Sequence, residues 1–215
     1  MYIDDWGSYR VRWHAFVWDQ DTGMQDLGSL SGGDTWAFDI NNTGWVLGQD
    51  YGSYQDDSRV FMWDIDDGTS VIDVPGAFYG RWMRLNDARQ AVGNTTGAAG
   101  SFPRAVIWDA VAGTRYLDDT GAHFISAAGI NNLGQVVGWV ADSPTDVLPF
   151  VWDEASGTRA LVSPTSLSAS AADINNLSEI VGWAEMGELA GIHAFLWSGD
   201  QVIDLNDLIP GGVVL

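Results

Sequence analysis

The sequence predicts an all-β fold, a β-propeller of five four-stranded blades in which one blade is shared or incomplete between the chain termini. Two observations predict it: two different motifs recur with one period, and each period contains four short segments with the pattern of strands. The period is 44 or 45 residues, which is typical of one propeller blade. Helices are not expected, because Gly, Asn or Asp breaks every helical pattern within about ten residues. Residues 1–215 are therefore expected to form a single domain.

The first motif is a Phe-x-Trp strand that is apolar on both faces, as expected for a strand that is covered on both sides. A turn that ends in glycine and a short second strand follow it, and glycine adopts positive φ without strain, so we expect a hairpin. The five copies, 44 or 45 residues apart, are located by their tryptophans: Trp18, Trp63, Trp108, Trp152 and Trp197.

The second motif is an Asn-rich turn between a third strand and a fourth strand that contains Val-Gly or Leu-Gly. Its copies begin at Asn41, Asn86, Asn131 and Asn175, again 44 or 45 residues apart. Asn side chains commonly cap tight turns, and this is the simpler interpretation of the series. A polar ring contributed by successive blades is the alternative.

The phase of the motifs places the repeats along the chain. They span about 14–58, 59–103, 104–147 and 148–192, and the fifth combines 193–215 with 1–13. The chain is about ten residues short of five full repeats. We therefore expect the two ends to share one blade, which would protect its edges; a piece of a longer array is the alternative.

The charge of the chain argues against two classes of partner. Asp and Glu total 29 against nine basic residues, all arginine, which gives a net charge of −20. Phosphate backbones and anionic lipids repel such a chain, so we expect no nucleic-acid partner. No apolar run approaches the roughly 20 residues of a membrane span, and the N-terminal residues lack the pattern of a signal peptide, so we expect no membrane insertion. The chain has no cysteine, which excludes disulfides and thiolate sites.

Three segments together resemble the HAF-repeat family over nearly the whole chain. They are His-Ala-Phe-x-Trp at 14–18, Asp-Leu-Gly-Ser-Leu-Ser-Gly-Gly at 26–33 and Ile-Asn-Asn-x-Gly-Gln-Val-Val-Gly at 130–138. The resemblance implies a bacterial repeat protein, extracellular or at the cell surface, with propeller-like domains; it implies no established chemistry. The second repeat departs most from the pattern, with Arg59 for His, Asp87 for Asn and Arg89 for Gly.

Aromatic residues outside the recurring Phe-x-Trp position are the candidate ligand-binding residues. A flat ring stacks on the apolar face of a sugar, so together with nearby carboxylates these rings predict a glycan or extracellular polymer as partner. The alternative is that they fill gaps between blades. The candidates are Trp36, Trp45, Tyr51, Tyr54, Trp82, Trp139 and Trp183.

Calcium (Ca2+) is the candidate cofactor, because alternate Asp side chains in a glycine-bent loop supply several of the oxygens that it needs. The third and fourth copies of this loop lose the second Asp, so an ordinary Asp-Gly hairpin turn is the alternative. His14 and His193 occupy equivalent repeat positions and are interpreted as structural. The candidate ligands are Asp19, Asp21, Asp26, Asp64 and Asp66.

Three functional hypotheses follow. The first is a non-enzymatic extracellular protein that acts as a binding, adhesion or matrix scaffold. The second is a structural subunit of an extracellular assembly or filament, which self-associates when the incomplete blade accepts a strand from another chain. The third is a glycosidase-like propeller enzyme with paired carboxylates at the axis. Similar, apolar inner strands and the lack of a nucleophile elbow, phosphate loop or zinc-binding helix disfavour it, so we predict no enzymatic activity and no catalytic residues.

Overall fold

The computed structural model describes residues 2–3, 9–52, 58–74, 84–96, 103–117, 121–143, 146–165, 167–187 and 191–209. Within these residues the secondary structure consists of β-strands and one short 3-10 helix near the C-terminal end. The strands form four four-stranded sheets and two two-stranded sheets, and every pairing between them is antiparallel. The all-β prediction is thereby confirmed.

Each sheet is built from strands that are consecutive in the chain. The two-stranded sheets pair β1 (Tyr2–Ile3) with β2 (Tyr9–Arg10), and β3 (Phe16–Asp19) with β4 (Gly23–Asp26). The first two full sheets are β5 (Asp34–Ile40), β6 (Val46–Tyr51), β7 (Arg59–Asp64), β8 (Gly68–Ile72), and β9 (Arg84–Leu85), β10 (Ala91–Thr96), β11 (Pro103–Asp109), β12 (Gly113–Tyr116). The last two are β13 (Phe124–Ile130), β14 (Val136–Ala141), β15 (Val147–Asp153), β16 (Gly157–Ala160), and β17 (Ala169–Ile174), β18 (Ile180–Glu185), β19 (Ile192–Ser198), β20 (Gln201–Asp204), followed by helix η3 (Leu205–Leu208).

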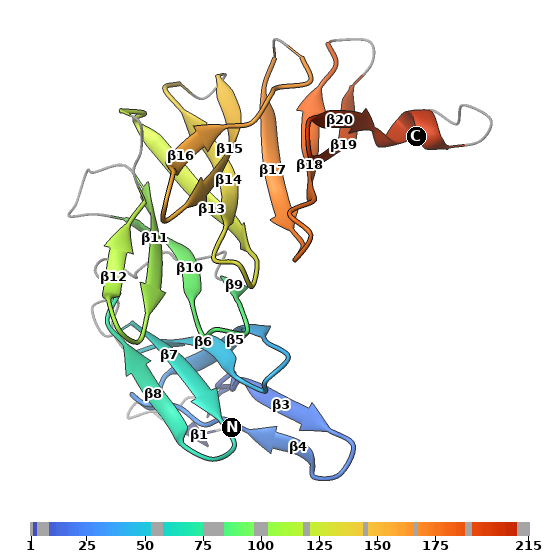
Figure 1. The fold of residues 1–215 in the computed structure, drawn as a ribbon. Coiled ribbons are helices and arrows are strands. Elements are labelled where there is room, and N and C mark those ends of the chain that lie inside the picture. The colour runs from blue at the N-terminus through green and yellow to red at the C-terminus, as the bar shows by residue number, and fades with distance from the viewer. Residues whose placement is uncertain are drawn as a thin grey trace.

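The sheets follow one another along an arc that is open on one side (Figure 1). The first strands of neighbouring full sheets contact one another, as β5 does β9 and β13 does β17. These first strands form the inner side of the arc, while the fourth strands β8 and β12 lie on its outer side (Figure 1).

Each full sheet after the first packs its Phe-x-Trp strand against the sheet that precedes it in the chain. In the last of these junctions, Phe195 and Trp197 of β19 form one core cluster with Val137 of β14 and Val151 of β15. Because successive side chains of a strand point to opposite faces, Leu196 points away from this cluster. Burying an apolar side chain of this size stabilises the fold by about 1.5–3 kcal/mol. The internal sheets have apolar side chains on both faces, as the sequence pattern predicted.

A glycine in the second strand of the sheets lies where the first strand approaches too closely for any side chain. A Cβ atom on Gly138 would lie 1.9 Å from the carbonyl oxygen of Ser126, and one on Gly182 would lie 2.0 Å from that of Ser170. A register shift in the first strand, between Ala127 and Gly129, produces this approach in the third sheet. The recurring Val-Gly of the second motif is therefore required by a β-bulge.

The sheets are offset from the sequence repeats by two strands. The repeat at 14–58 contains β3 and β4, which form one sheet, and β5 and β6, which open the next. Apart from the two-stranded β1–β2 sheet, the described strands form five units in chain order, of which the β3–β4 hairpin is the incomplete one.

The expected sharing of one blade between the chain ends is not seen in the described residues. The sheet β17–β20 is complete by itself, and it lies at the opposite end of the arc from the β3–β4 hairpin (Figure 1). Within residues 1–13, which were expected to complete the fifth repeat, β1 pairs with β2. Residues 210–215, which a shared blade would also use, lie outside the described residues.

In the part of the chain that the structure describes, no helix has the length and apolar character needed to cross a membrane.

Candidate binding face at the asparagine turns

The turn between the first and second strands has the same hydrogen bonds in all four full sheets. In the third sheet, the amide of Asn131 donates to the carbonyl of Gln135 at 3.1 Å, and the amide of Gly134 donates back to the carbonyl of Asn131 at 3.1 Å. The side-chain Oδ1 of Asn131 accepts from the amides of Leu133 and Gln135, both at 3.0 Å. In the other three copies this Oδ1 also accepts the amide four residues on, at 2.9 Å. The predicted capping role of the Asn series is confirmed.

The same asparagines also connect the sheets, a role that was not predicted from the sequence. The side-chain Nδ2 of each donates to the backbone carbonyl of the next: Asn41 to Asn86 at 2.9 Å, Asn86 to Asn131 at 2.9 Å, and Asn131 to Asn175 at 3.0 Å. We call this series of three bonds the asparagine ladder. Asn41, Asn86 and Asn131 thus each use the side-chain oxygen for their own turn and the nitrogen for the neighbouring sheet, so the capping asparagines also form an open polar row.

A second row of hydrogen bonds runs beside the ladder, through the residue after each asparagine. The amide of Asn42 donates to Asp87 Oδ1 at 2.9 Å, and the amide of Asp87 donates to Asn132 Oδ1 at 2.8 Å. Asp87 Oδ2 accepts from the side-chain amides of Asn42 at 3.0 Å and Asn132 at 2.7 Å. These bonds, the one from the Asn42 side chain first, hold the pKa of Asp87 below its ordinary value. Asp in place of the second Asn therefore keeps the turn geometry.

The four turns surround an open, polar hollow of about 340 Å³. Its lining includes the residue before the Ile or Leu of each turn in three of the sheets, namely Asp39, Arg84 and Asp173. Asp39 Oδ2 accepts the amide of Leu85 in the next sheet at 2.8 Å, which fixes this carboxylate across the junction. Asp173 lies near Gly129, where any Cβ would come within 2.8 Å of Asp173 Oδ1. The hollow therefore presents carboxylate, amide and backbone groups from four sheets in fixed positions.

Solved structures with the same arrangement of sheets are known. The β-propeller domain of the Trilobed protease from Pyrococcus furiosus matches with a TM-score of 0.60 and 11% sequence identity, over 87% of this chain and 60% of that one. The chain is a β-propeller. TolB from Acinetobacter baumannii matches with a TM-score of 0.59 and 12% identity, over 88% of this chain and 48% of that one. The chain thus spans about half to three fifths of these structures, which show its fold and nothing of its function.

Comparison by sequence found no matching family model and no significant match to a curated protein. The HAF-repeat resemblance therefore stays a prediction. In the propeller, the four full sheets are blades, their first strands lie innermost, and the asparagine turns join these inner strands to the second strands.

The propeller distributes the candidate sugar-binding aromatic residues over different positions of the blades. Trp36, on β5, is more than half exposed. Trp45, in the first asparagine turn, is partly buried and packs against the core between the first two full blades. Trp139 and Trp183 are partly buried at the same position of the second strand in neighbouring blades. Tyr51 is partly buried at the end of β6, and Tyr54 and Trp82 lie outside the described residues.

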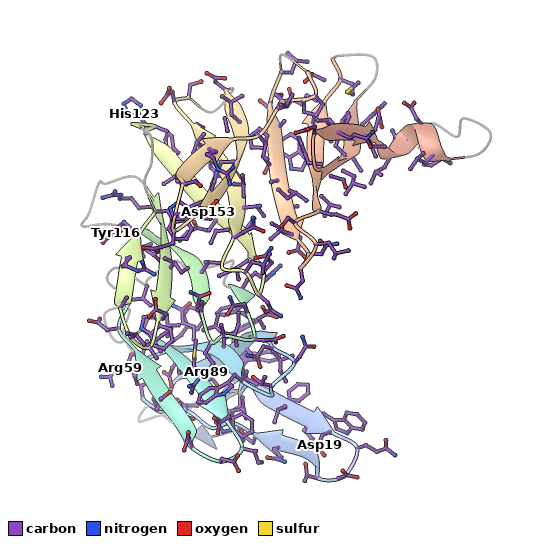
Figure 2. All side chains as sticks on the ribbon, in the orientation of Figure 1. Asp19, Arg59, Arg89, Tyr116, His123 and Asp153 are labelled. Carbon is purple, nitrogen blue, oxygen red and sulfur yellow. The ribbon has the colours of Figure 1, made fainter. Side chains whose placement is uncertain are left out.

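The candidate calcium ligands belong to hairpin turns whose carboxylates accept backbone amides. Asp19 lies in the β3–β4 turn (Figure 2), and its Oδ1 accepts the amides of Asp21 and Thr22, both at 2.8 Å. Asp64 Oδ1 accepts the amides of Asp66 and Asp67 at 2.8 and 2.6 Å. The third and fourth copies, which lack the second Asp, have the same bonds at Asp109 and Asp153. These contacts favour the hairpin-turn interpretation, and no three His, Asp or Glu side chains of the described residues gather as metal ligands.

Asp26 lies away from Asp19 and Asp21, at the other end of the same hairpin, where it pairs with a histidine. His14 Nδ1 lies 2.9 Å from Asp26 Oδ2, and this contact first, then the amide of Gly28, lowers the pKa of Asp26. At the equivalent position of the last blade, His193 Nδ1 lies 2.7 Å from Asp204 Oδ2. Each His-Asp pair joins the third strand of a blade to the fourth, as the structural interpretation of these histidines predicted.

Arg89 adopts the left-handed backbone conformation that glycine holds in two of the other turns. Its φ is 60°, against 89° for Gly44 and 75° for Gly134. Its amide still donates to the carbonyl of Asn86 at 3.1 Å, so the second turn keeps the common geometry. Its guanidinium lies 4.9 Å from the centre of the Trp45 ring. The departure from the repeat pattern at this position therefore changes the side chain and not the turn.

We expect Arg89→Gly to be more stable than Arg89→Ala by about 1 kcal/mol, because only glycine adopts this φ without strain. Both variants remove the contact with Trp45, so their difference isolates the backbone conformation. Urea unfolding followed by tryptophan fluorescence measures it. Equal stabilities would show that the left-handed conformation is unstrained here.

A carboxylate that the sequence did not single out is buried in the loop between β4 and β5. Asp50, at the end of β6, is fully buried, and Asp50 Oδ2 accepts from Ser29 Oγ at 2.8 Å and from the amides of Leu30 and Ser31 at 2.5 and 3.2 Å. The Ser31 hydroxyl donates to Asp50 Oδ1. Burial alone raises the pKa of Asp50, but these hydrogen bonds outweigh it and hold the pKa below its ordinary value. The Ser-Leu-Ser segment of the first repeat thus folds around this carboxylate.

We expect Asp50→Asn to lower the free energy of unfolding at neutral pH by roughly 1–3 kcal/mol, because a charged acceptor of several hydrogen bonds is lost. A carboxyl group whose folded pKa is depressed stabilises the protein above its unfolded pKa of about 3.9, and this stability disappears as the pH falls through the folded value. The variant should therefore lose less stability than the wild type between about pH 5 and pH 2. Urea unfolding across this range measures both slopes, with exposed Asp67→Asn as control. Parallel slopes for Asp50→Asn and wild type would contradict the assignment.

Proposed function

We propose that this propeller is a non-enzymatic extracellular repeat protein that binds a polyhydroxylated ligand, a glycan or an extracellular polymer, at the hollow of the asparagine turns. The hollow is the observation that carries the proposal, because it gathers polar groups from four blades. The ladder and the Asp39–Leu85 contact hold these groups in place before a ligand arrives. Fixed donors and acceptors bind hydroxyl groups without a further ordering cost.

Several carboxyl groups of the described residues have a pKa below the ordinary value. Hydrogen bonds that each carboxylate accepts lower the pKa, and the charge of His14, Arg115 or Arg159 adds to the lowering at Asp26, Asp109 and Asp153, respectively. The carboxyl groups are Asp19, Asp26, Asp50, Asp87, Asp109 and Asp153. Support for the extracellular setting comes from the resemblance to the HAF-repeat family.

A glycan array probed with the full chain, once with calcium and once with a chelator, tests the proposal. We expect binding to a set of related glycans in both conditions. In the double variant Asp39→Asn, Asp173→Asn, binding should fall at least about tenfold, because two acceptors at the hollow lose their charge. The matched control is Asp67→Asn, Asp142→Asn, at two exposed positions that do not line the hollow. Silence across the array in both conditions, or equal binding by the two double variants, would contradict the proposal.

A structural subunit is the second candidate, and the β3–β4 hairpin favours it. Within the described residues β3 has β4 as its one hydrogen-bonded neighbour, whereas the third strand of every full blade is paired on both sides. A free edge of this kind accepts an added strand, and strand exchange between chains would build an assembly.

A further inference from the structure

The two ends of the arc expose the two halves of a contact that is repeated inside the molecule. At each internal junction, the Phe-x-Trp side of one blade covers the apolar side of the blade before it. At the last junction, Phe195 and Trp197 are 5% and 4% exposed. Val137, which they cover on the preceding blade, is 0% exposed. Well-packed apolar contacts of this kind provide most of the stability that holds neighbouring blades together.

The β3–β4 hairpin presents the Phe-x-Trp half of this contact mostly exposed to solvent. Phe16 and Trp18, the equivalents of Phe195 and Trp197, are 55% and 64% exposed. Met24 pairs with Trp18 across the hairpin and is also exposed. We call Phe16, Trp18 and Met24 the head face. Exposed apolar groups that gather on one surface are typical of an interaction site.

The last blade presents the other half. Val181 of β18 is the equivalent of Val137, yet it is 41% exposed. It pairs with Leu196 of β19, which pairs in turn with Ile203 of β20, and these three side chains form a row on the free side of the sheet. A hollow of about 240 Å³ lies on this side, lined in part by Val181 and Leu196. We call Val181, Leu196 and Ile203 the tail face.

We infer that the head face of one molecule packs against the tail face of a second copy of this chain, and so forms a further blade junction between molecules. Four of the six residues have counterparts of the same kind, at the same register positions, in the last internal junction: Phe16 and Trp18 match Phe195 and Trp197, and Val181 and Leu196 match Val137 and Val151. Met24 and Ile203 add apolar side chains at positions where the third blade has Thr158 and Arg159. This contact continues an interface that the molecule already forms, and it does not rest on the ligand proposed above.

A second copy fits the geometry better than closure within one chain. The head and tail faces lie at opposite ends of the open arc (Figure 1). The ladder sets the same Asn-to-carbonyl bond at all three junctions between full blades, at 2.9, 2.9 and 3.0 Å. Bringing the two ends together within one chain would require the angles between its blades to change. The head face of a second copy can pack against the tail face with these angles unchanged. The contact is heterologous, because two different surfaces meet in it.

The charge of the chain predicts how this contact responds to salt. Each molecule carries a net charge of −20, so two copies repel one another. Salt screens this repulsion and leaves the apolar contact intact. Association should therefore be stronger at high salt than at low salt, which is the reverse of the response of an interface that is held by ion pairs.

Sedimentation equilibrium of the full chain, at rising concentration and in high salt, tests the inference. We expect the mean mass to rise with concentration above that of one chain. Trp18→Glu at the head face and Val181→Glu at the tail face should each weaken association at least about tenfold, because each buries a charge in the contact. Val111→Glu is the matched control: Val111 is exposed in the turn between β11 and β12, away from both faces, and this variant should associate like the wild type. Far-ultraviolet circular dichroism checks that all three variants fold.

Mixing the two face variants gives the sharpest result. Trp18→Glu keeps an intact tail face and Val181→Glu keeps an intact head face, so an equimolar mixture should form a complex of two chains and nothing larger. If the mean mass of the wild-type protein equals that of one chain at every concentration, the inference is overturned and closure within the chain is indicated. Assembly that persists in both variants would also overturn it and indicate strand exchange at the β3 edge.

Discussion

We expect Gly138→Ala to lower the free energy of unfolding by about 3 kcal/mol. The added Cβ would lie 1.9 Å from the carbonyl oxygen of Ser126, a distance at which backbone must move. The contact is between two strands of one sheet, so the movement would break the register on both sides of the bulge at Ala127 and Gly129. Chemical denaturation measures the change.

Gly157→Ala serves as the control for this prediction. Gly157 has φ of 67° and nothing within 4 Å of its Cβ position, so alanine there meets backbone strain without a clash. We expect it to cost about 1 kcal/mol. If both variants lose the same stability, the close approach at Gly138 does not determine the choice of glycine.

The second large effect is expected at the asparagine ladder, where Asn131→Ala should destabilise the propeller by about 3 kcal/mol. Asn131 is buried, and its side chain caps its own turn while it donates to the carbonyl of Asn175 in the next blade and to Gln135 Oε1. Alanine removes all of these bonds at once. Urea unfolding followed by tryptophan fluorescence measures the loss.

The last copy of the turn separates the two roles of this asparagine. Asn175 caps its own turn in the same way, but it is exposed, and its side-chain amide donates within the turn, to Glu179 Oε2 at 2.7 Å. We expect Asn175→Ala to cost about 1 kcal/mol, the usual value of a lost cap. The difference between the two variants then measures the bond between blades. Equal losses would mean that the ladder contributes nothing beyond capping.

Much of the fold could be predicted because two independent motifs recur with the same period in the sequence. The Phe-x-Trp strand and the asparagine turn keep one period, and a pattern that is apolar on both faces requires a sheet covered on both sides. The offset of the sheets from the repeats could not be predicted in this way. A periodic sequence can be divided into units at any point, and only the hydrogen bonds show that β3 and β4 belong to one sheet while β5 and β6 begin another.

The candidate site was predicted less completely. The asparagine series was recognised but interpreted as turn capping and not as a site, since sequence alone does not show where each end of a short amide points. Asp39 and Asp173 were not singled out, although their place just before Ile-Asn-Asn in two repeats was a signal. Asp50 could not have been found, because its partners lie about 20 residues away in the chain.

By itself, the sequence determined that this chain consists of stacked four-stranded units with apolar faces. Local periodicity is sufficient for that, because each unit has the same two apolar faces to cover. Only the tertiary structure showed that the arc is open and which side chains its two end sheets expose. Those features depend on the curvature that accumulates over successive junctions, and no single repeat contains that information.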